Sequence, residues 1–195
     1  MNVLVVQGSP RKKGNSATLA ATLADTLAEN GGQVTTCFLN DLNYKGCQAC
    51  EACKTGSDTC VIQDDLAPVL ADFQLADVVI LATPVYWAEV SAQMKGMIDR
   101  LYSFLTPNFM SARKKHRLPP GKQLVFIQTQ GAPEEDLYDD IFERYNSFFK
   151  QIGFFKRAYL LRCCGVSEAA DVSYRPESIA QARLIARQIC TDRSR

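Results

Sequence analysis

Four cysteines stand close together in the first third of the chain. They are Cys47, Cys50, Cys53 and Cys60, with the spacing C-x2-C-x2-C-x6-C. Two overlapping C-x-x-C spacings place three thiolates around one small volume, and the fourth comes from the same loop, as a [4Fe–4S] cluster requires. Zinc fits less well, because structural zinc sites usually combine two separated C-x-x-C pairs. The pattern predicts either a cluster or, as the alternative, a loop of plain thiols.

A second segment, GSPRKKGNSA at residues 8–17, joins an apolar run to a helical pattern and suits an anion. Its side-chain donors and positive charges are Ser9, Arg11, Lys12, Lys13, Asn15 and Ser16. The first N–H groups of a helix lack intrahelical partners, and the helix dipole favours negative charge there. The segment is neither a Walker loop nor G-x-G-x-x-G, since Asn15 stands where the Walker lysine would be. The alternative to a phosphate cradle is a polar turn in which Asn15 and Ser16 cap the helix.

Flat aromatic side chains follow the third apolar run, in the segment PVYW at residues 84–87. Tyr86 and Trp87 in an irregular loop beside a phosphate site suit a flavin ring, which needs an apolar slot and a few polar contacts. The alternative is that both side chains pack under a loop or in a dimer contact. Thr129 and Gly131, after the fourth apolar run, can offer a hydroxyl and backbone N–H groups to the edge of such a ring.

The elements that must position these segments alternate between strand and helix patterns. Apolar runs predict strands at 2–7, 34–39, 78–83, 124–130 and 158–163, and helical periodicity predicts helices at 16–30, 64–73, 91–105, 137–152 and 176–190. Five alternations favour a doubly wound, five-stranded parallel sheet with helices on both faces, because parallel strands need crossover connections. Ligands of such α/β folds bind beyond the carboxyl ends of the strands, where the three segments would lie.

Whole-chain properties narrow the functional classes. The 195 residues suit one domain, 1–195, with a cysteine-rich loop at 46–61 and a basic insertion at 106–122, and the formal net charge is +1. This charge does not suit a polybasic nucleic-acid binder. The apolar start, Val3–Val6, is too short for a signal peptide and no stretch approaches a membrane span, so we expect a cytoplasmic protein without structural disulfides. The chain has one histidine, His116, so a hydrolase with a histidine-based catalytic triad is disfavoured.

The basic insertion has three interpretations. Its cationic residues are Arg113, Lys114, Lys115, His116 and Arg117. They could steer an acidic electron donor such as a ferredoxin, or meet the 2′-phosphate of NADPH. The third interpretation is a solvated loop with no ligand.

These segments together resemble the NADPH-dependent FMN reductase and iron–sulfur flavoprotein group of the flavodoxin-like superfamily. The matching segments are GSPRKKGNS (8–16), GCQACEACKTGSDTCVIQDD (46–65), TPVYW (83–87) and SAQMKGMIDR (91–100). The resemblance implies that the first loop binds the FMN phosphate through Ser9, Arg11, Asn15, Ser16 and Ala17. It further implies that Pro84, Val85, Tyr86 and Trp87 hold the isoalloxazine ring, and that the protein forms a homodimer or homotetramer.

Three functions compete at this point. The first is an NAD(P)H-dependent reductase of flavin, quinone or similar acceptors, in which bound FMN supplies the electron chemistry. The second is an iron–sulfur flavoprotein that exchanges electrons with ferredoxin through a [4Fe–4S] cluster. The third is a four-cysteine zinc or redox-sensing module, which would contain zinc and no flavin. The PVYW segment argues against the third, and no catalytic acid is evident in the sequence.

Overall fold

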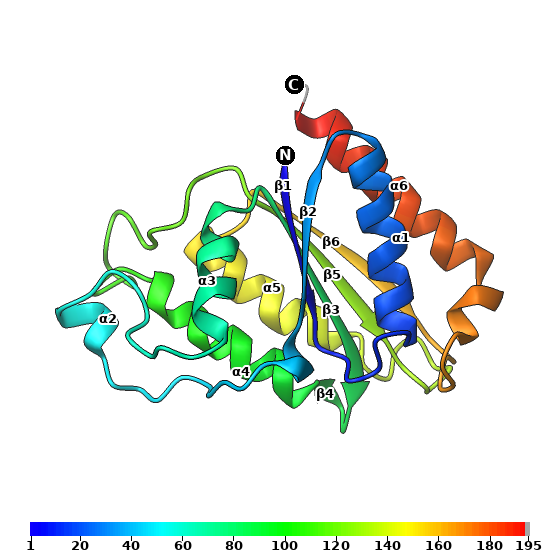
Figure 1. Ribbon diagram of the computed structural model, residues 1–195, viewed down its shortest axis with the longest axis horizontal. Helices are drawn as coiled ribbons and strands as arrows, with labels where there is room; N and C mark the ends of the chain where they lie inside the picture. Colours follow the sequence, from blue (N-terminus) through cyan, green and yellow to red (C-terminus); the bar gives the residue numbers. More distant parts are fainter. Residues whose placement is uncertain (194–195) are drawn as a thin grey trace.

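The computed structural model describes residues 1–193, and its centre is a sheet with the strand order β2-β1-β3-β5-β6 (Figure 1). The parallel strands are β1 (Asn2–Gln7), β2 (Gln33–Phe38), β3 (Val78–Tyr86), β5 (Gln123–Thr129) and β6 (Arg157–Cys163). One further short strand, β4 (Glu89–Val90), pairs antiparallel with the end of β3. The doubly wound, five-stranded parallel sheet predicted from the sequence is therefore confirmed.

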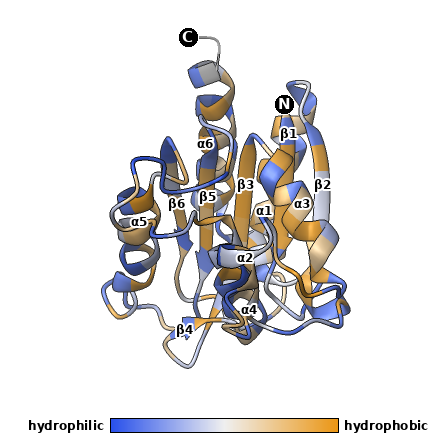
Figure 2. Cartoon of the chain, turned by 90° about the vertical axis from the view of Figure 1, so that its left-hand side faces the viewer, coloured by the Kyte–Doolittle hydropathy of each residue, from blue (hydrophilic) through white to orange (hydrophobic). Residues whose placement is uncertain are grey.

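Each central strand is apolar on both faces because helices cover both sides of the sheet. In β1, Leu4 and Val6 belong to one buried cluster, and Val3 and Val5 belong to the other. This alternation follows from the two-residue period of a strand. Figure 2 shows β1, β3 and β5, the strands in the middle of the sheet, as mostly hydrophobic.

The helices divide between the two faces of the sheet (Figure 1). Helices α1 (Asn15–Glu29) and α6 (Pro176–Arg193) cover one face, and α3 (Leu66–Leu75), α4 (Ala92–Arg100) and α5 (Asp140–Ile152) cover the other. Short helical segments complete the chain: η1 (Leu39–Asp41), α2 (Ala52–Thr55), η2 (Leu101–Phe104) and η3 (Asp171–Tyr174). The cysteine-rich loop and α2 lie on the side of α3, α4 and α5.

All five predicted helices have somewhat different bounds in the structure, and the helices on the side of α3, α4 and α5 illustrate this. The helix expected at 91–105 is regular only to Arg100 and then tightens into the 3-10 turn η2, where Ser103 Oγ donates to the Arg100 carbonyl at 2.9 Å. The helix expected from residue 137 begins at Asp140. The helix expected from residue 64 begins at Leu66, whose N–H donates to Asp64 Oδ1 at 3.2 Å.

The PVYW segment is not the irregular loop that the sequence suggested. Strand β3 continues through Tyr86 and turns back into β4, so Trp87 and Ala88 form a two-residue hairpin turn. Their φ angles are 51° and 62°, both in the left-handed region. Two central residues with positive φ are typical of a type I′ turn, which usually carries Asn-Gly. The sequence lacks that signature, and this explains why the hairpin was missed.

The basic insertion is more ordered than a solvated loop. His116 pairs with Leu105 in a β-bridge and packs edge-on against Phe154, with ring centroids 5.4 Å apart. Lys122 is 2% exposed, and its Nζ donates to the carbonyls of Phe73, Gln74 and Ala76 at the end of α3. Burial lowers the pKa of Lys122 to about 8.

Within the described residues, no helix is both long and apolar enough to cross a membrane.

Candidate functional site

The loops after β1, β3 and β5 meet at one edge of the sheet because these strands are neighbours and run in parallel. Hydrogen bonds join the first two loops directly: Gly8 N donates to the Ala82 carbonyl at 2.8 Å, and Ser91 Oγ donates to the Gly8 carbonyl at 2.7 Å. Ser91 N in turn donates to Thr83 Oγ1 at 3.0 Å. Pro84 pairs with Thr129 in the register of β3 and β5. The loop after β5 therefore begins beside the loop after β3. We call this set of loops the strand-end edge.

The start of α1 at this edge suits an anion. Gly14 precedes the helix, no side chain caps it, and the first turn has no acidic residue. The first N–H groups therefore face no competing carboxylate, and they favour a phosphate. Ser9 Oγ accepts from Arg11 N at 3.1 Å, which folds the loop toward the helix. A Cβ at Gly14 would lie 3.1 Å from the Arg11 carbonyl, so the tight loop leaves little room for a side chain there.

Asn15 has a structural partner that the sequence did not reveal. Its Nδ2 donates to the carbonyls of Val166 and Glu168 at 3.3 and 2.9 Å, and its Oδ1 accepts from Val172 N at 3.1 Å. Arg11 joins the same segment, because its Nη1 donates to the Ser167 carbonyl at 3.0 Å. Asn15 thus fixes the chain after β6 against the start of α1. The alternative in which Asn15 and Ser16 cap the helix is wrong, since both lie inside it.

The hairpin beside this cradle presents its aromatic side chains outward. Trp87 is 101% exposed and Tyr86 45% exposed, so packing under their own loop does not explain them. The base of the hairpin is firmly held, because Glu89 accepts from Arg144 Nη2 at 2.8 Å and from the Tyr145 hydroxyl at 3.0 Å. Burial, followed by the Glu89 charge, raises the pKa of Tyr145. The hairpin thereby places a flat aromatic pair at the strand-end edge.

The remaining residues predicted to bind the flavin lie at the same edge. Pro84 and Val85 are half-buried in the hairpin strand, and Ser16 and Ala17 are buried in the first turn of α1. Thr129 is the last residue of β5. Gly131 follows two positions later and packs against Ser167, because a Cβ at Gly131 would lie 2.7 Å from Ser167 Oγ. The structure thus brings the predicted cofactor residues together at one edge, and their contacts with FMN stay a prediction.

The four motif cysteines line one narrow pocket. Cys53 is buried, Cys60 is half-buried, and Cys47 and Cys50 are exposed. The pocket has about 20 Å³ of free space, which is close to one water molecule, so a cluster would have to spread the loop. Within residues 1–193, no three His, Cys, Asp or Glu side chains stand ready to hold a single metal ion. The ligands of a cube attach to different iron atoms, and the donor set of four thiols facing one pocket fits that group.

Both ends of the cysteine-rich loop are anchored at one point. Asn43 N donates to Asp65 Oδ2 at 2.8 Å, and Asp65 N donates back to the Asn43 carbonyl at 3.4 Å. Asp64 Oδ2 accepts from Lys45 N at 3.1 Å. The chain therefore leaves and re-enters the sheet region at nearly the same place.

Two cations hold the middle of the loop. Lys54 Nζ donates to the carbonyls of Tyr102 and Leu105 at 2.7 and 2.9 Å, and lies 4.0 Å from the centre of the Tyr102 ring. It also lies 3.4 Å from Cys53 Sγ. Arg117 Nη2 donates to the Cys53 carbonyl at 3.2 Å, and Arg117 Nε pairs with Asp58 at 3.0 Å. Positive charge therefore surrounds the buried cysteine.

A third cation, Arg100, lies beneath the loop and lines the same pocket. Its Nη1 donates to the Lys45 carbonyl and to Asp64 Oδ2, both at 2.9 Å, and its Nη2 donates to the Ile62 carbonyl at 3.2 Å. Burial opposes the charged guanidinium, but Asp64 and Cys60 outweigh it, so the pKa of Arg100 lies above its usual value. The sequence analysis missed this residue, although a lone cation on the apolar stripe of Met94, Met97 and Leu101 signals a buried partner.

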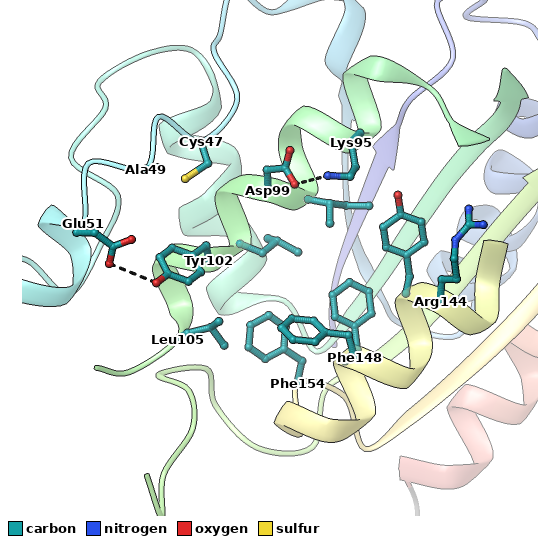
Figure 3. Close-up of a pocket in the computed structure, with 14 residues that line it drawn as sticks. Cys47, Ala49, Glu51, Lys95, Asp99, Tyr102, Leu105, Arg144, Phe148 and Phe154 are labelled. Carbon is teal, nitrogen blue, oxygen red and sulfur yellow. Dashed lines mark hydrogen bonds and ion pairs between the residues drawn. The ribbon is translucent and has the colours of Figure 1, made fainter. Parts of the chain in front are cut away.

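An apolar groove of about 570 Å³ runs from the cysteine-rich loop to α5 (Figure 3). Cys47 and Glu51 stand at one end and Arg144 at the other, with Tyr102, Phe148 and Phe154 between them. Because Arg144 also binds Glu89, the groove links the hairpin of the strand-end edge to the cysteine-rich loop.

Several solved structures share this fold. An NAD(P)H:quinone oxidoreductase from Methanothermobacter marburgensis superposes with a TM-score of 0.73 at 21% identity, covering 97% of this chain and 96% of that one. An FMN-dependent NADH-azoreductase from Bacillus anthracis, in complex with FMN, gives a TM-score of 0.70 at 15% identity, covering 97% of this chain and 100% of that one. At these identities the likeness shows the flavodoxin-like fold alone.

Sequence relatives are more specific. An iron–sulfur flavoprotein of Methanosarcina thermophila is 32% identical over 114 residues, which are 58% of this chain and 59% of that protein. One from Methanocaldococcus jannaschii is 37% identical over 100 residues, which are 51% of each chain. The chain thus matches a little over half the length of these relatives. The sequence profile of the NADPH-dependent FMN reductase family matches residues 1–135, more than half of the chain, and the chain therefore belongs to that family.

Proposed function

We propose that the chain binds FMN at the strand-end edge and acts as an NAD(P)H-dependent oxidoreductase on flavin, quinone or similar acceptors. One observation carries this proposal: the uncapped start of α1 and the exposed aromatic hairpin lie on two loops joined by the Gly8–Ala82 and Ser91–Gly8 hydrogen bonds. An anion-binding helix start beside a flat apolar surface matches the two chemically different halves of FMN.

The roles of this chain's residues follow from their places. The N–H groups of Ser16 and Ala17, with the Ser9 hydroxyl, would bind the phosphate, and Arg11 would add positive charge. Tyr86 and Trp87 would cover one face of the flavin ring and exclude water from it. Thr129 and Gly131 would bind the ring edge. When bound, FMN supplies the electron chemistry, and the protein supplies position and environment.

The direct test is the cofactor itself. Protein purified from cells, or reconstituted with added FMN, should be yellow and should release FMN rather than FAD on denaturation. The flavin should bleach when NADPH or NADH is added without air and should recover with a quinone. A protein that stays colourless after reconstitution would end the proposal, whereas binding without bleaching would leave only the nicotinamide step wrong.

The second candidate function is an iron–sulfur flavoprotein that exchanges electrons with ferredoxin. It is supported by the single pocket that all four motif cysteines line and by the cations Lys54, Arg100 and Arg117 around it. Thiolates and a cluster are anionic, so adjacent positive charge favours them. A [4Fe–4S] cluster would supply one-electron exchange, and the four cysteines would hold it.

Iron and sulfide analysis tests this candidate. Anaerobically reconstituted protein should contain about four irons and about four sulfides per chain. Alanine at any one of Cys47, Cys50, Cys53 and Cys60 should lower the iron content sharply, whereas Cys190→Ala should not. Equal iron in all five variants would show that the metal is bound elsewhere.

The state of assembly and the location of the protein follow less directly from the site. We expect a homodimer or homotetramer, because exposed Trp87 and Phe148 offer apolar surface that a second copy can cover. Sedimentation of FMN-loaded protein measures this. A cytoplasmic location stays a prediction and can be tested by fractionation.

A further inference from the structure

Arg100 has one donor without an acceptor in an otherwise complete set of contacts. Its side chain is fully buried, and its two terminal nitrogens bind the Lys45 and Ile62 carbonyls and the Asp64 carboxylate. The remaining nitrogen, Nε, is buried and has no hydrogen-bond partner among residues 1–193. A buried donor left unpaired lowers the stability of the fold, so we look for an acceptor that reaches this nitrogen when the site is filled.

The place of Arg100 shows what that acceptor is. Arg100 lines the pocket that all four motif cysteines, Cys60 among them, also line. Its three satisfied contacts lie at residues 45, 62 and 64, immediately outside the cysteine-rich loop of 46–61. The guanidinium therefore holds both ends of the loop, and the same side chain lines the cysteine pocket.

A directed hydrogen bond, rather than net charge, explains why an arginine is needed here. Asp64 already balances one positive charge, so Arg100 on its own adds little net potential to the pocket. Four thiolates around a cluster carry a net negative charge, which grows when the cluster is reduced. A directed N–H donor, unlike a distant charge, acts on one sulfur and stabilises the more negative state more strongly.

We propose that Arg100 is a positioning residue of the cysteine site, whose Nε–H donates to a sulfur of the bound [4Fe–4S] cluster, either Cys60 Sγ or a sulfide. This inference rests on the proposed cluster. It assigns Arg100 two roles: its terminal nitrogens anchor the two ends of the loop, and its Nε raises the reduction potential of the cluster.

Pulsed electron paramagnetic resonance of the reduced cluster tests this contact in the unaltered protein. Protein grown with nitrogen-15 arginine, reconstituted anaerobically and reduced with dithionite, should show a hyperfine coupling to one arginine nitrogen. Arg100→Lys should abolish the coupling, while Arg113→Lys, at an exposed position of the basic insertion, should preserve it. Coupling that persists in Arg100→Lys would overturn the assignment.

The reduction potential gives an independent measurement. Arg100→Gln should hold a cluster whose midpoint potential is lower than that of the wild type. Arg113→Gln removes an equal charge from an exposed position of the basic insertion and should leave the potential unchanged. Equal potentials in the wild type and Arg100→Gln would overturn the tuning role.

The outcomes separate the two levels of the proposal. If the wild type takes up no iron, the cluster and the Arg100 contact both fail, and FMN binding is untouched. If the wild type holds the cluster without arginine coupling, only the Arg100 contact fails. If Arg100→Gln does not fold, Arg100→Lys and the labelled wild type still decide through the hyperfine coupling.

Discussion

The strand-end edge and the cysteine-rich loop are built in different ways. Backbone atoms fix most of the edge: the register of β1, β3 and β5 and the Gly8–Ala82 hydrogen bond set the loops, and the short side chain of Ser91 adds one further bond. Long cationic side chains fix the cysteine-rich loop. Lys54 reaches out of the loop to the Tyr102 carbonyl, Arg100 binds the Lys45 carbonyl just before the loop, and Arg117 binds the Cys53 carbonyl within it. The backbone geometry of the strand-end edge should therefore change little when most of its side chains are replaced. The geometry of the cysteine-rich loop should change when a single cationic side chain is replaced.

The largest effect should come from a charge placed at the helix start. Ser16→Asp puts a carboxylate where the phosphate is proposed, and like-charge repulsion should weaken FMN binding on the order of 100-fold. Fluorescence titration with FMN measures this. Ala21→Asp, on the exposed face of the same helix, should bind nearly as well as the wild type. Equal losses in the two variants would move the phosphate away from this helix start.

Loss of the Asp64 carboxylate should have the largest effect on the cysteine-rich loop. Burial raises the pKa of Asp64, but the hydrogen bonds from Arg100 and from the Lys45 and Leu66 N–H groups outweigh it, and the pKa lies below its usual value. Asp64→Asn should lower the free energy of unfolding at pH 7 by about 2 kcal/mol, because it leaves Arg100 buried without a counter-charge.

The same variant should show a defined pH dependence. A carboxyl whose folded pKa is depressed contributes stability above its unfolded value of 3.8, and this contribution is lost as the pH falls through the folded pKa. Urea unfolding of the wild type and Asp64→Asn should therefore converge in acid. Asp58→Asn, at an ion pair whose carboxylate is 88% exposed, should change stability little at any pH. A constant difference between wild type and Asp64→Asn down to acid pH would contradict the assigned cause.

A smaller effect is expected at the aromatic hairpin. Trp87→Ala should weaken FMN binding by about 1 kcal/mol, the scale of one aromatic contact, and should shift the flavin spectrum. It should leave the unfolding of FMN-free protein unchanged, because the side chain is fully exposed. Unchanged affinity together with a loss of the dimer would assign Trp87 to a contact between copies.

The smallest effect should be a gain of stability. Ala88→Gly removes a Cβ from a residue with a φ of 62° and should raise the free energy of unfolding by about 0.5–1 kcal/mol. Ala21→Gly makes the same chemical change inside α1 and should destabilise by a similar amount. Thermal unfolding of both variants measures the pair, and a loss of stability in both would mean that the turn is unstrained.

Sequence reasoning succeeded where local pattern decides structure. The apolar runs located all five parallel strands to within about three residues at each end, because strands buried on both faces need continuous apolar sequence. The loops at the strand-end edge followed from that order alone. Their contacts with FMN stay a prediction.

Contacts between distant residues were beyond such reasoning. Asn15 binds carbonyls more than 150 positions away, and its local sequence suggested only a cap or a ligand. The sequence assigns Lys122 to the basic insertion because its neighbours are cationic. In the structure it is buried and binds carbonyls at the end of α3. Arg100 looked like one more charge on a helix. In each case a long polar side chain satisfies backbone groups of another element, and neither periodicity nor composition encodes its target.

The joined ends of the cysteine-rich loop bear on how its length can change. Asn43 and Asp65 bind each other, so the chain between them forms a loop whose two ends are joined. The number of residues in the loop therefore does not change the distance between those ends. The entropy of closing a flexible loop rises only with the logarithm of its length, by about 0.6 kcal/mol for each doubling. A few residues added between Cys53 and Cys60 would then cost the fold very little. The spacing before the fourth cysteine is therefore free to vary, while the first three remain bound to their short C-x-x-C intervals.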